Sequence, residues 1–189
     1  MRITEKALFI LAITAFILRL LLIPGAQVLV FFLVFLLCGY YFYFGFALFN
    51  GIGFRAIFKK RSYTGIPSNN ILGGILAGVA MAIACVGIIF KLQHWPGAGI
   101  QLLFGTALCT IVFIVSIVKR RGAYPQFYKR ILTRVTILLF FCFSLILIPK
   151  QILFEIMYRN RPALIEAQER SWADPTNQEL RDKLQEEWH

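Results

Sequence analysis

Charged side chains are scarce in the apolar part of this chain, and three of them stand beside two similar turns: Arg19, Lys91 and His94. A histidine next to a lysine suits a proton relay, and basic groups at the start of a helix suit anion binding. Basic side chains can also simply extend from a helix end toward lipid headgroups. We favour this interfacial role, because the three residues lie near the expected membrane surface and the first 149 residues offer no buried carboxylate partner.

The two turns belong to a longer internal repeat. The string RLLLIPGA at residues 19–26 returns as KLQHWPGA at residues 91–98, and the same shift of 72 aligns Phe32 with Phe104. Proline is tolerated at the first position of a helix, and glycine lets a chain fold back tightly. We therefore predict two parallel-repeated hairpins, at about 7–49 and 71–118, in which each proline begins the second helix. The turn residues are Pro24, Gly25, Ala26, Trp95, Pro96, Gly97 and Ala98.

The composition excludes a soluble globular domain. Apolar residues make up 59% of the 189 residues, and the mean hydropathy is +0.72. Five apolar stretches are long enough to cross about 30 Å of hydrocarbon as helices. We predict an all-α, polytopic membrane helical bundle over residues 1–149, followed by an extramembrane helical tail over 150–189. The five expected spans are 7–23, 28–49, 71–90, 100–118 and 131–148.

The basic residues predict the orientation. Twelve lysines and arginines precede the first span, lie between the second and third spans or surround the link between the fourth and fifth, whereas only Arg19 and Lys91 fall on the opposite side before the tail. The positive-inside rule then places the protein in a bacterial inner membrane with a cytoplasmic N-terminus and a periplasmic tail. The net charge of +11 does not indicate nucleic-acid binding, because these residues punctuate apolar spans.

The third span contains a surface of small residues that favours close helix packing. Gly74 and Gly78 are four residues apart, and Ala77 and Ala84 extend the surface. The first span, the fourth span and a second copy of the protein are all possible neighbours. Internal packing is the commoner case.

The tail ends in a short amphipathic helix. Leu180, Leu184 and Trp188 are four residues apart, and Asp174 followed by Pro175 is typical of a helix start. We expect this apolar stripe to dock on the protein's own surface, while the alternative is the binding of a partner in a groove.

No arrangement of residues points to an enzyme, a metal site or a cofactor. Only two histidines occur, His94 and His189, and no zinc-binding, phosphate-binding or nucleophile motif is present. All four cysteines lie in apolar runs, where a thiol packs as a small apolar group. We therefore expect no catalytic residue and no bound metal.

The string FKLQHWPGA at residues 90–98 resembles the turn between the two membrane helices of the gliding-motility L protein family (GldL) of Bacteroidota. The resemblance implies an inner-membrane hairpin of a proton-driven motor that is partnered by a single-span M subunit. Lys91 and His94 match the family string residue by residue. The glutamate of the family's second helix has no counterpart between Ile100 and Val118, and the family's large cytoplasmic region after the hairpin has none either.

We therefore expect a non-enzymatic inner-membrane protein that acts as a subunit or assembly partner of a membrane complex. Its partners would be the lipid bilayer and either another protein or further copies of itself. The alternative is a small transporter or channel whose polar mouth is formed by Arg19, Lys91 and His94, since transporters often contain internal repeats.

Overall fold

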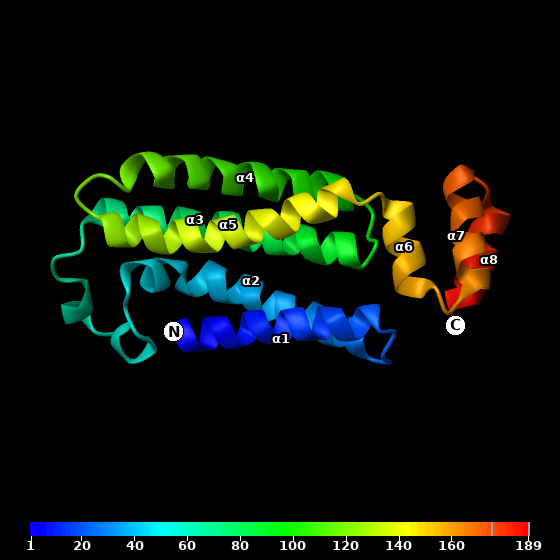
Figure 1. Cartoon of the computed structure of the whole chain (residues 1–189), viewed down its shortest axis with the longest axis horizontal. Coiled ribbons are helices and arrows are strands. Elements are labelled where there is room, and N and C mark those ends of the chain that lie inside the picture. The colour runs from blue at the N-terminus through cyan, green and yellow to red at the C-terminus, as the bar shows by residue number, and fades with distance from the viewer. Residues whose placement is uncertain (175, 189) are drawn as a thin grey trace.

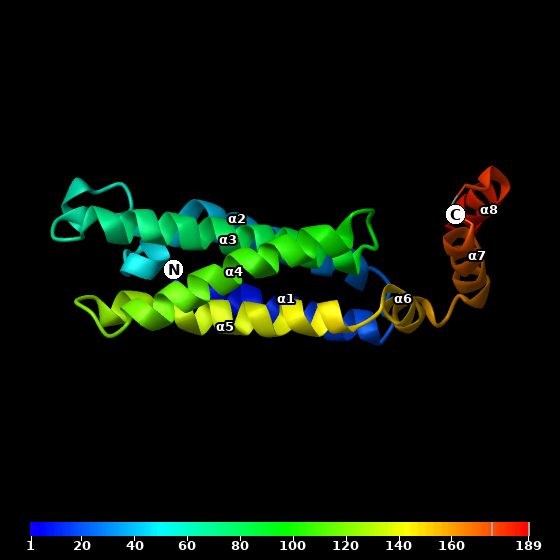
Figure 2. The same ribbon diagram turned by 90° about the horizontal axis from the view of Figure 1, so that it is seen from above.

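The computed structural model describes residues 1–174 and 176–188, and these segments contain helices and no strand. Five long helices run side by side along the long axis of the molecule (Figures 1 and 2). They are α1 (Arg2–Leu20), α2 (Ala26–Asn50), α3 (Ser68–Leu92), α4 (Ala98–Lys119) and α5 (Pro125–Leu147). Two short 3-10 helices, η1 (Phe54–Ala56) and η2 (Lys60–Tyr63), lie between α2 and α3. The expected all-α class is confirmed.

Four of the long helices, α2 to α5, are long and apolar enough to cross a membrane. The remaining helix, α1, carries Glu5, Lys6 and Arg19 and falls outside this group. A multi-span membrane protein is therefore confirmed, whereas a fifth crossing and the internal repeat stay predictions.

All five long helices begin before the predicted apolar runs, and two of them do so by five residues or more. The first helix extends from Arg2 to Leu20 rather than over 7–23, and α5 begins at Pro125 rather than at 131. Proline at the first helical position is already close to the helical φ and has no donor to leave unpaired. Polar side chains at these helix ends find partners inside the protein, so the helices extend beyond their apolar stretches.

The second helix of each hairpin begins after the proline, so the expectation that Pro24 and Pro96 are first helical residues is wrong. Gly25 and Gly97 precede α2 and α4 with φ values of 80° and 77°. This left-handed conformation is favourable for glycine and cannot belong to a right-handed helix. The prolines therefore lie within the turns.

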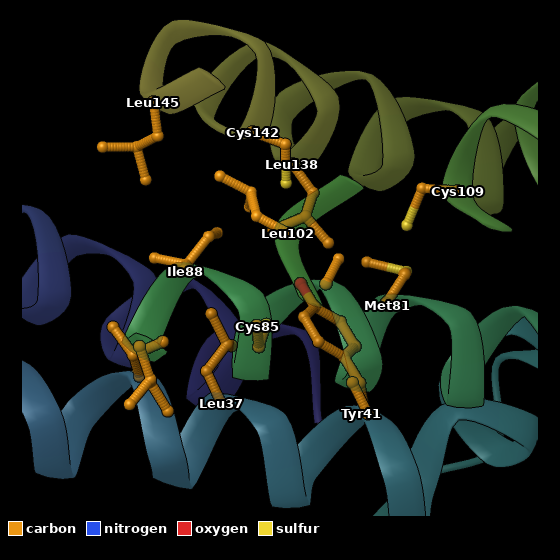
Figure 3. Close-up of a cluster of buried hydrophobic side chains, with 14 of the residues drawn as sticks. Leu37, Tyr41, Met81, Cys85, Ile88, Leu102, Cys109, Leu138, Cys142 and Leu145 are labelled. Atoms are coloured by element: carbon orange, nitrogen blue, oxygen red, sulfur yellow. The ribbon is translucent and has the colours of Figure 1, made fainter. Parts of the chain in front are cut away.

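Helix α3 lies at the centre of the bundle, and its Met81 and Cys85 are fully buried. Figure 3 shows them among side chains of α2, α4 and α5, including Tyr41, Leu102 and Cys142. Large apolar side chains also cover the outer surface, and examples exposed by 69 to 80% are Ile100, Phe140 and Leu147. An apolar interior with an apolar exterior suits a bundle whose surrounding solvent is hydrocarbon.

The tail forms three helices beyond the turn end of the bundle (Figure 1). They are α6 (Lys150–Tyr158), α7 (Pro162–Ala173) and α8 (Gln178–Trp188). The predicted start at Asp174 is wrong, because Asp174 ends α7 and the side chain of Asn177 accepts the first N–H groups of α8 instead. Pro175 lies outside the described residues.

The expected apolar face of α8 turns toward the protein in part. Leu184 packs against the buried core cluster, and Leu180 is half-buried. The side chain of Trp188 lies outside the described residues. Helix α8 contacts α7, as the expected docking on the protein's own surface requires.

Candidate functional site

The two turns share one backbone geometry. The N–H of Ile23 donates to the carbonyl of Leu18 at 3.1 Å, and the N–H of Trp95 donates to the carbonyl of Phe90 at 3.0 Å. Each bond joins the first and last of six consecutive residues. The two bonds close the last turn of α1 and of α3 in the same manner. Donors and acceptors in the two turns are related by the shift of 72 that relates the two sequence strings.

Each turn also holds a residue other than glycine in the left-handed conformation. Leu22 has a φ of 60° and His94 a φ of 56°, again 72 positions apart. A side chain in this region costs roughly 1 kcal/mol relative to glycine. At His94 the strained backbone directs the imidazole ring toward the tail helix α6, where it contacts Phe154.

Arg19 is buried beneath α6 with 4% of its surface exposed. Its Nε donates to Sδ of Met157 at 3.3 Å, and its Nη2 donates to the carbonyl of Leu92 at 3.2 Å and the hydroxyl of Tyr158 at 3.4 Å. Its Nη1 is buried without a hydrogen-bond partner among the described residues. A buried guanidinium with no carboxylate beside it is costly, so the site retains capacity to accept an anionic group.

Two glutamines link the turns to each other and to α6. The hydroxyl of Tyr158 donates to Oε1 of Gln27 at 3.3 Å, and Nε2 of Gln27 donates to Oε1 of Gln93 at 2.9 Å. Sequence analysis missed this role of α6. The available signal was an aromatic and sulfur-containing face, Phe154, Met157 and Tyr158, in a segment too polar to cross the membrane.

His94 lies against aromatic rings. Its ring centre is 5.0 Å from that of Phe154 and 6.0 Å from that of Tyr158, and its Nε2 is buried without a partner among the described residues. Burial, together with the positive charges of Arg19 and Lys91, lowers the pKa of His94 to about 4. The imidazole is therefore neutral at neutral pH, and holding a proton there requires a nearby negative charge.

The other turn residues lie closer to the surface. Lys91 is half-buried and forms no hydrogen bond or ion pair within the described chain. Trp95 is 43% exposed, and its ring lies 5.0 Å from that of Phe90 and 6.1 Å from that of Phe31. The structure thus brings Arg19 and His94 together around Tyr158 and leaves Lys91 at the edge.

We call Arg19, His94, Phe154 and Tyr158 the turn cluster. Its side chains are hydrogen-bond donors and aromatic rings. It offers no carboxylate and no nucleophile paired with a base, so it can hold an anionic group or clamp the helices but shows no arrangement for bond cleavage. No group of three or more metal-binding side chains occurs among the described residues.

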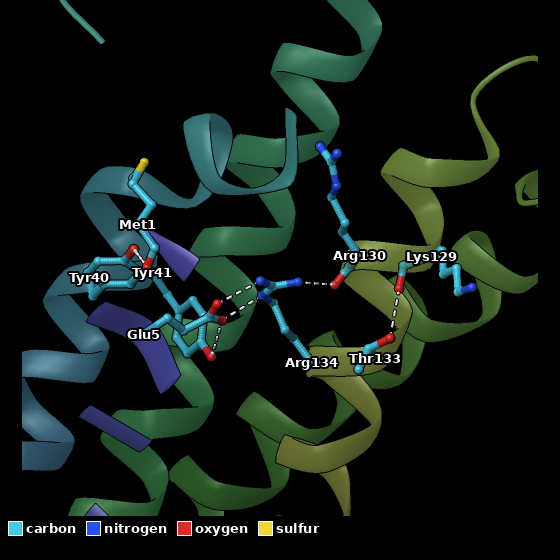
Figure 4. A network of polar contacts seen from close by, with 8 residues as sticks. All are labelled: Met1, Glu5, Tyr40, Tyr41, Lys129, Arg130, Thr133 and Arg134. Atoms are coloured by element: carbon cyan, nitrogen blue, oxygen red, sulfur yellow. Dashed lines mark hydrogen bonds and ion pairs between the residues drawn. The ribbon is translucent and has the colours of Figure 1, made fainter. Parts of the chain in front are cut away.

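A second polar network, which sequence analysis missed, lies at the opposite end of the bundle (Figure 4). Glu5 is 6% exposed and binds Arg134 of α5 through two contacts, Nε to Oε1 at 2.5 Å and Nη2 to Oε2 at 2.6 Å. The Tyr41 hydroxyl donates to Oε1 at 3.1 Å. The first 149 residues therefore do contain a buried carboxylate, but it pairs with Arg134 and not with Lys91 or His94. A single acid within an apolar region was the available signal, since it requires a partner.

The small residues of α3 pack against α2, which was not among the expected neighbours. A Cβ atom on Gly78 would lie 2.5 Å from the carbonyl oxygen of Tyr41, and one on Gly74 would lie 3.0 Å from Cα of Phe46. These backbones approach too closely for any side chain. The contact is internal to the chain.

The opposite side of α3 makes a similar contact with α4. A Cβ on Gly105 would lie 2.6 Å from Cα of Ala84, and Ala77 and Ala84 are buried. Small residues therefore let α3 approach both neighbours.

Comparison with known proteins identifies one family. Residues 76–130 match the family model described as the GldL N-terminal domain. This segment contains most of α3, the second turn, α4 and the start of α5, and it confirms the resemblance to GldL over that part of the chain. No curated protein and no solved structure matches the chain. The match and the apolar helices support a GldL-like protein of the inner membrane.

Proposed function

We propose that this chain is a non-enzymatic subunit or assembly partner of an inner-membrane complex related to the gliding-motility machinery. One observation carries the proposal: the segment similar to the GldL N-terminal domain contains the second turn together with the helices on both sides of it. At that turn, Arg19 of α1 and Tyr158 of α6 pack around His94. The GldL-like hairpin is thus embedded in a larger bundle through its turn.

Five crossings are part of the proposal. Two of the charges that separate α1 from the other long helices are buried, since Glu5 is 6% and Arg19 is 4% exposed, and the exposed Lys6 lies in the first two turns of the helix. A helix can carry such residues through a membrane when they face the protein interior and have partners there. Helix α1 runs alongside α2 in Figure 1.

The shared turn geometry supports a duplicated hairpin. Similar φ values recur after 72 residues, at Leu22 and His94 and again at Gly25 and Gly97. Hairpins α1–α2 and α3–α4 would then be two copies of one unit, with α5 and the tail added.

The proposed orientation places the basic loops in the cytoplasm and α6 to α8 in the periplasm. Single-cysteine labelling tests it, because the native cysteines lie inside the bundle. A membrane-impermeant maleimide should label Gln178→Cys in intact spheroplasts and should label Lys60→Cys only after lysis. The reverse pattern would overturn the orientation.

The charge distribution favours a scaffold over a proton-driven motor. Helix α4 contains no acidic residue, and the only carboxylate in the five long helices is Glu5. Glu5 is held by Arg134 in an ion pair at 2.5 Å.

Purification from the native membrane tests the proposal directly. The tagged chain in mild detergent should retain a reproducible protein partner or a defined oligomer by mass spectrometry and solution mass. An unrelated multi-span protein with the same tag is the control. A monomer that retains nothing beyond the control would overturn the proposal.

Ion or proton handling is the second candidate, because Nη1 of Arg19 and Nε2 of His94 are buried without partners among the described residues. The buried apolar core around Met81 and Cys85 lies between this cluster and Glu5. Liposome flux that disappears in a Lys91→Ala, His94→Ala double variant would favour this candidate, and unchanged or absent flux would remove it.

A further inference from the structure

An apolar cavity of about 220 Å³ lies between α1 and α5. Helix α1 contributes Phe9 and Ala12, α5 contributes Phe141 and Leu145, and residues of α2 and α3 form the floor. The single polar side chain in its wall, Ser144, donates its hydroxyl to a backbone carbonyl of its own helix. This cavity therefore offers no polar group to a ligand and suits a hydrocarbon chain.

A second cavity, of about 370 Å³, continues the first toward the basic loops. The two share three wall residues, Phe9, Leu37 and Leu138. The second is lined by cationic side chains together with one acid. The charged residues in its wall are Glu5, Lys6, Lys129, Arg130 and Arg134.

The charge of the second cavity is unbalanced. Glu5 neutralises Arg134, so the ammonium groups of Lys6 and Lys129 remain as a net positive wall. Lys6 and Lys129 are exposed, and neither ammonium has an ion-pair partner in the described part of the chain. Figure 4 shows Lys129 and Arg130 one turn before Arg134 on α5, with Glu5 of α1 facing Arg134. An anionic group is the complement of such a wall.

The cleft between α1 and α5 is too narrow for a helix. The rings of Phe9 and Phe141 meet edge to face at 5.9 Å and bridge α1 to α5. A helix with its side chains needs about 10 Å, so neither a partner helix nor a second copy can enter between them. A single acyl chain is narrow enough.

We propose that the cleft between α1 and α5 binds one anionic phospholipid. Its phosphate lies against Lys6 and Lys129, and one acyl chain follows the apolar cavity past Phe9. Basic pockets between membrane helices on the cytoplasmic side are suited to anionic headgroups. The lipid fills the space that separates the two helices joined by Glu5 and Arg134.

Native mass spectrometry of the purified protein in detergent tests the site. The probes are phosphatidylglycerol and phosphatidylcholine of the same acyl chains. We expect the anionic lipid to bind about tenfold better, and a Lys6→Gln, Lys129→Gln double variant to bring the ratio to within about twofold of one. The control is Lys59→Gln with Lys60→Gln, which removes the same charge from a loop outside the cleft and should leave the ratio unchanged.

A second pair of variants tests the binding of the acyl chain. Ala12→Phe fills the apolar cavity and should reduce retention of phosphatidylglycerol, whereas Ala107→Phe adds the same bulk at an exposed position of α4 and should not. Millimolar inorganic phosphate should fail to displace the lipid. Equal retention of both lipids, equal effects of the two lysine pairs, or displacement by phosphate alone would overturn the proposal. Correct folding of each variant is checked by its thermal unfolding and solution mass.

Discussion

Arg134 of α5 holds Glu5 of α1 with two nitrogens, at 2.5 and 2.6 Å, although 129 residues separate them in the sequence. The pair closes the basic end of the bundle across the cleft between the two helices. Arg134 is further fixed by donation from Nη1 to the carbonyl of Arg130 at 2.8 Å. Both charges are largely withdrawn from solvent, so each depends on the other.

Removing one partner of this pair should destabilise the bundle. We expect Glu5→Gln and Arg134→Gln each to lower the free energy of unfolding by about 3 kcal/mol, because the remaining charge stays buried without compensation. Thermal unfolding in detergent measures the loss. The double variant should lose less than the sum of the two. Additive losses would show that the pair is not coupled.

Because α2 and α3 approach closely, one added methyl group at their contact should destabilise the protein. Gly78→Ala places a Cβ 2.5 Å from the carbonyl oxygen of Tyr41, which forces the helices apart, so we expect a loss of about 2 kcal/mol or more. Gly73→Ala is the control on the same helix, because its Cβ would make an ordinary contact at 3.6 Å with the ring of Phe127. That variant should be neutral or slightly stabilising. Similar melting temperatures for both variants would contradict the packing.

The features that were predictable from the sequence depend on neighbours along the chain. Hydropathy marks membrane helices because a span needs a continuous apolar run, and a Pro-Gly pair marks a turn because it cannot continue a helix. Both turns lie where the PGA strings of 19–26 and 91–98 place them.

The features that were missed depend on contacts between distant segments. The order in which the helices pack determines three such pairs: Glu5 with Arg134, Arg19 with Tyr158, and Gly78 with Tyr41. Hydrophobic periodicity gives no helix order, so it could not identify α2 as the neighbour of the small residues in α3. Nor could it show that α6 covers Arg19.

The strained turn at Leu22 predicts a stabilising substitution. Leu22→Gly removes the penalty of a side chain at a φ of 60°, so we expect the melting temperature to rise by an amount equivalent to about 1 kcal/mol. The control is Leu21→Gly, where φ is −82° and glycine adds only flexibility to the unfolded chain. That variant should be destabilised. A loss at Leu22 equal to the loss at Leu21 would contradict the left-handed geometry.

Stability should depend on pH through His94. Its pKa is lowered from 6.5 to about 4 in the folded protein, so between these values the unfolded chain binds a proton that the folded chain does not. The stabilisation of the neutral ring is therefore complete above pH 6.5 and falls as the pH is lowered toward 4. Each unit of this shift is worth about 1.4 kcal/mol at most. Melting temperatures measured from pH 7.5 to 4 should decline in the wild type and decline less in His94→Asn, which tolerates the same backbone conformation without titrating. If the melting temperature falls equally with pH in the wild type and in His94→Asn, His94 takes up its proton in the folded state. This would occur if an anion occupied the turn cluster beside Arg19.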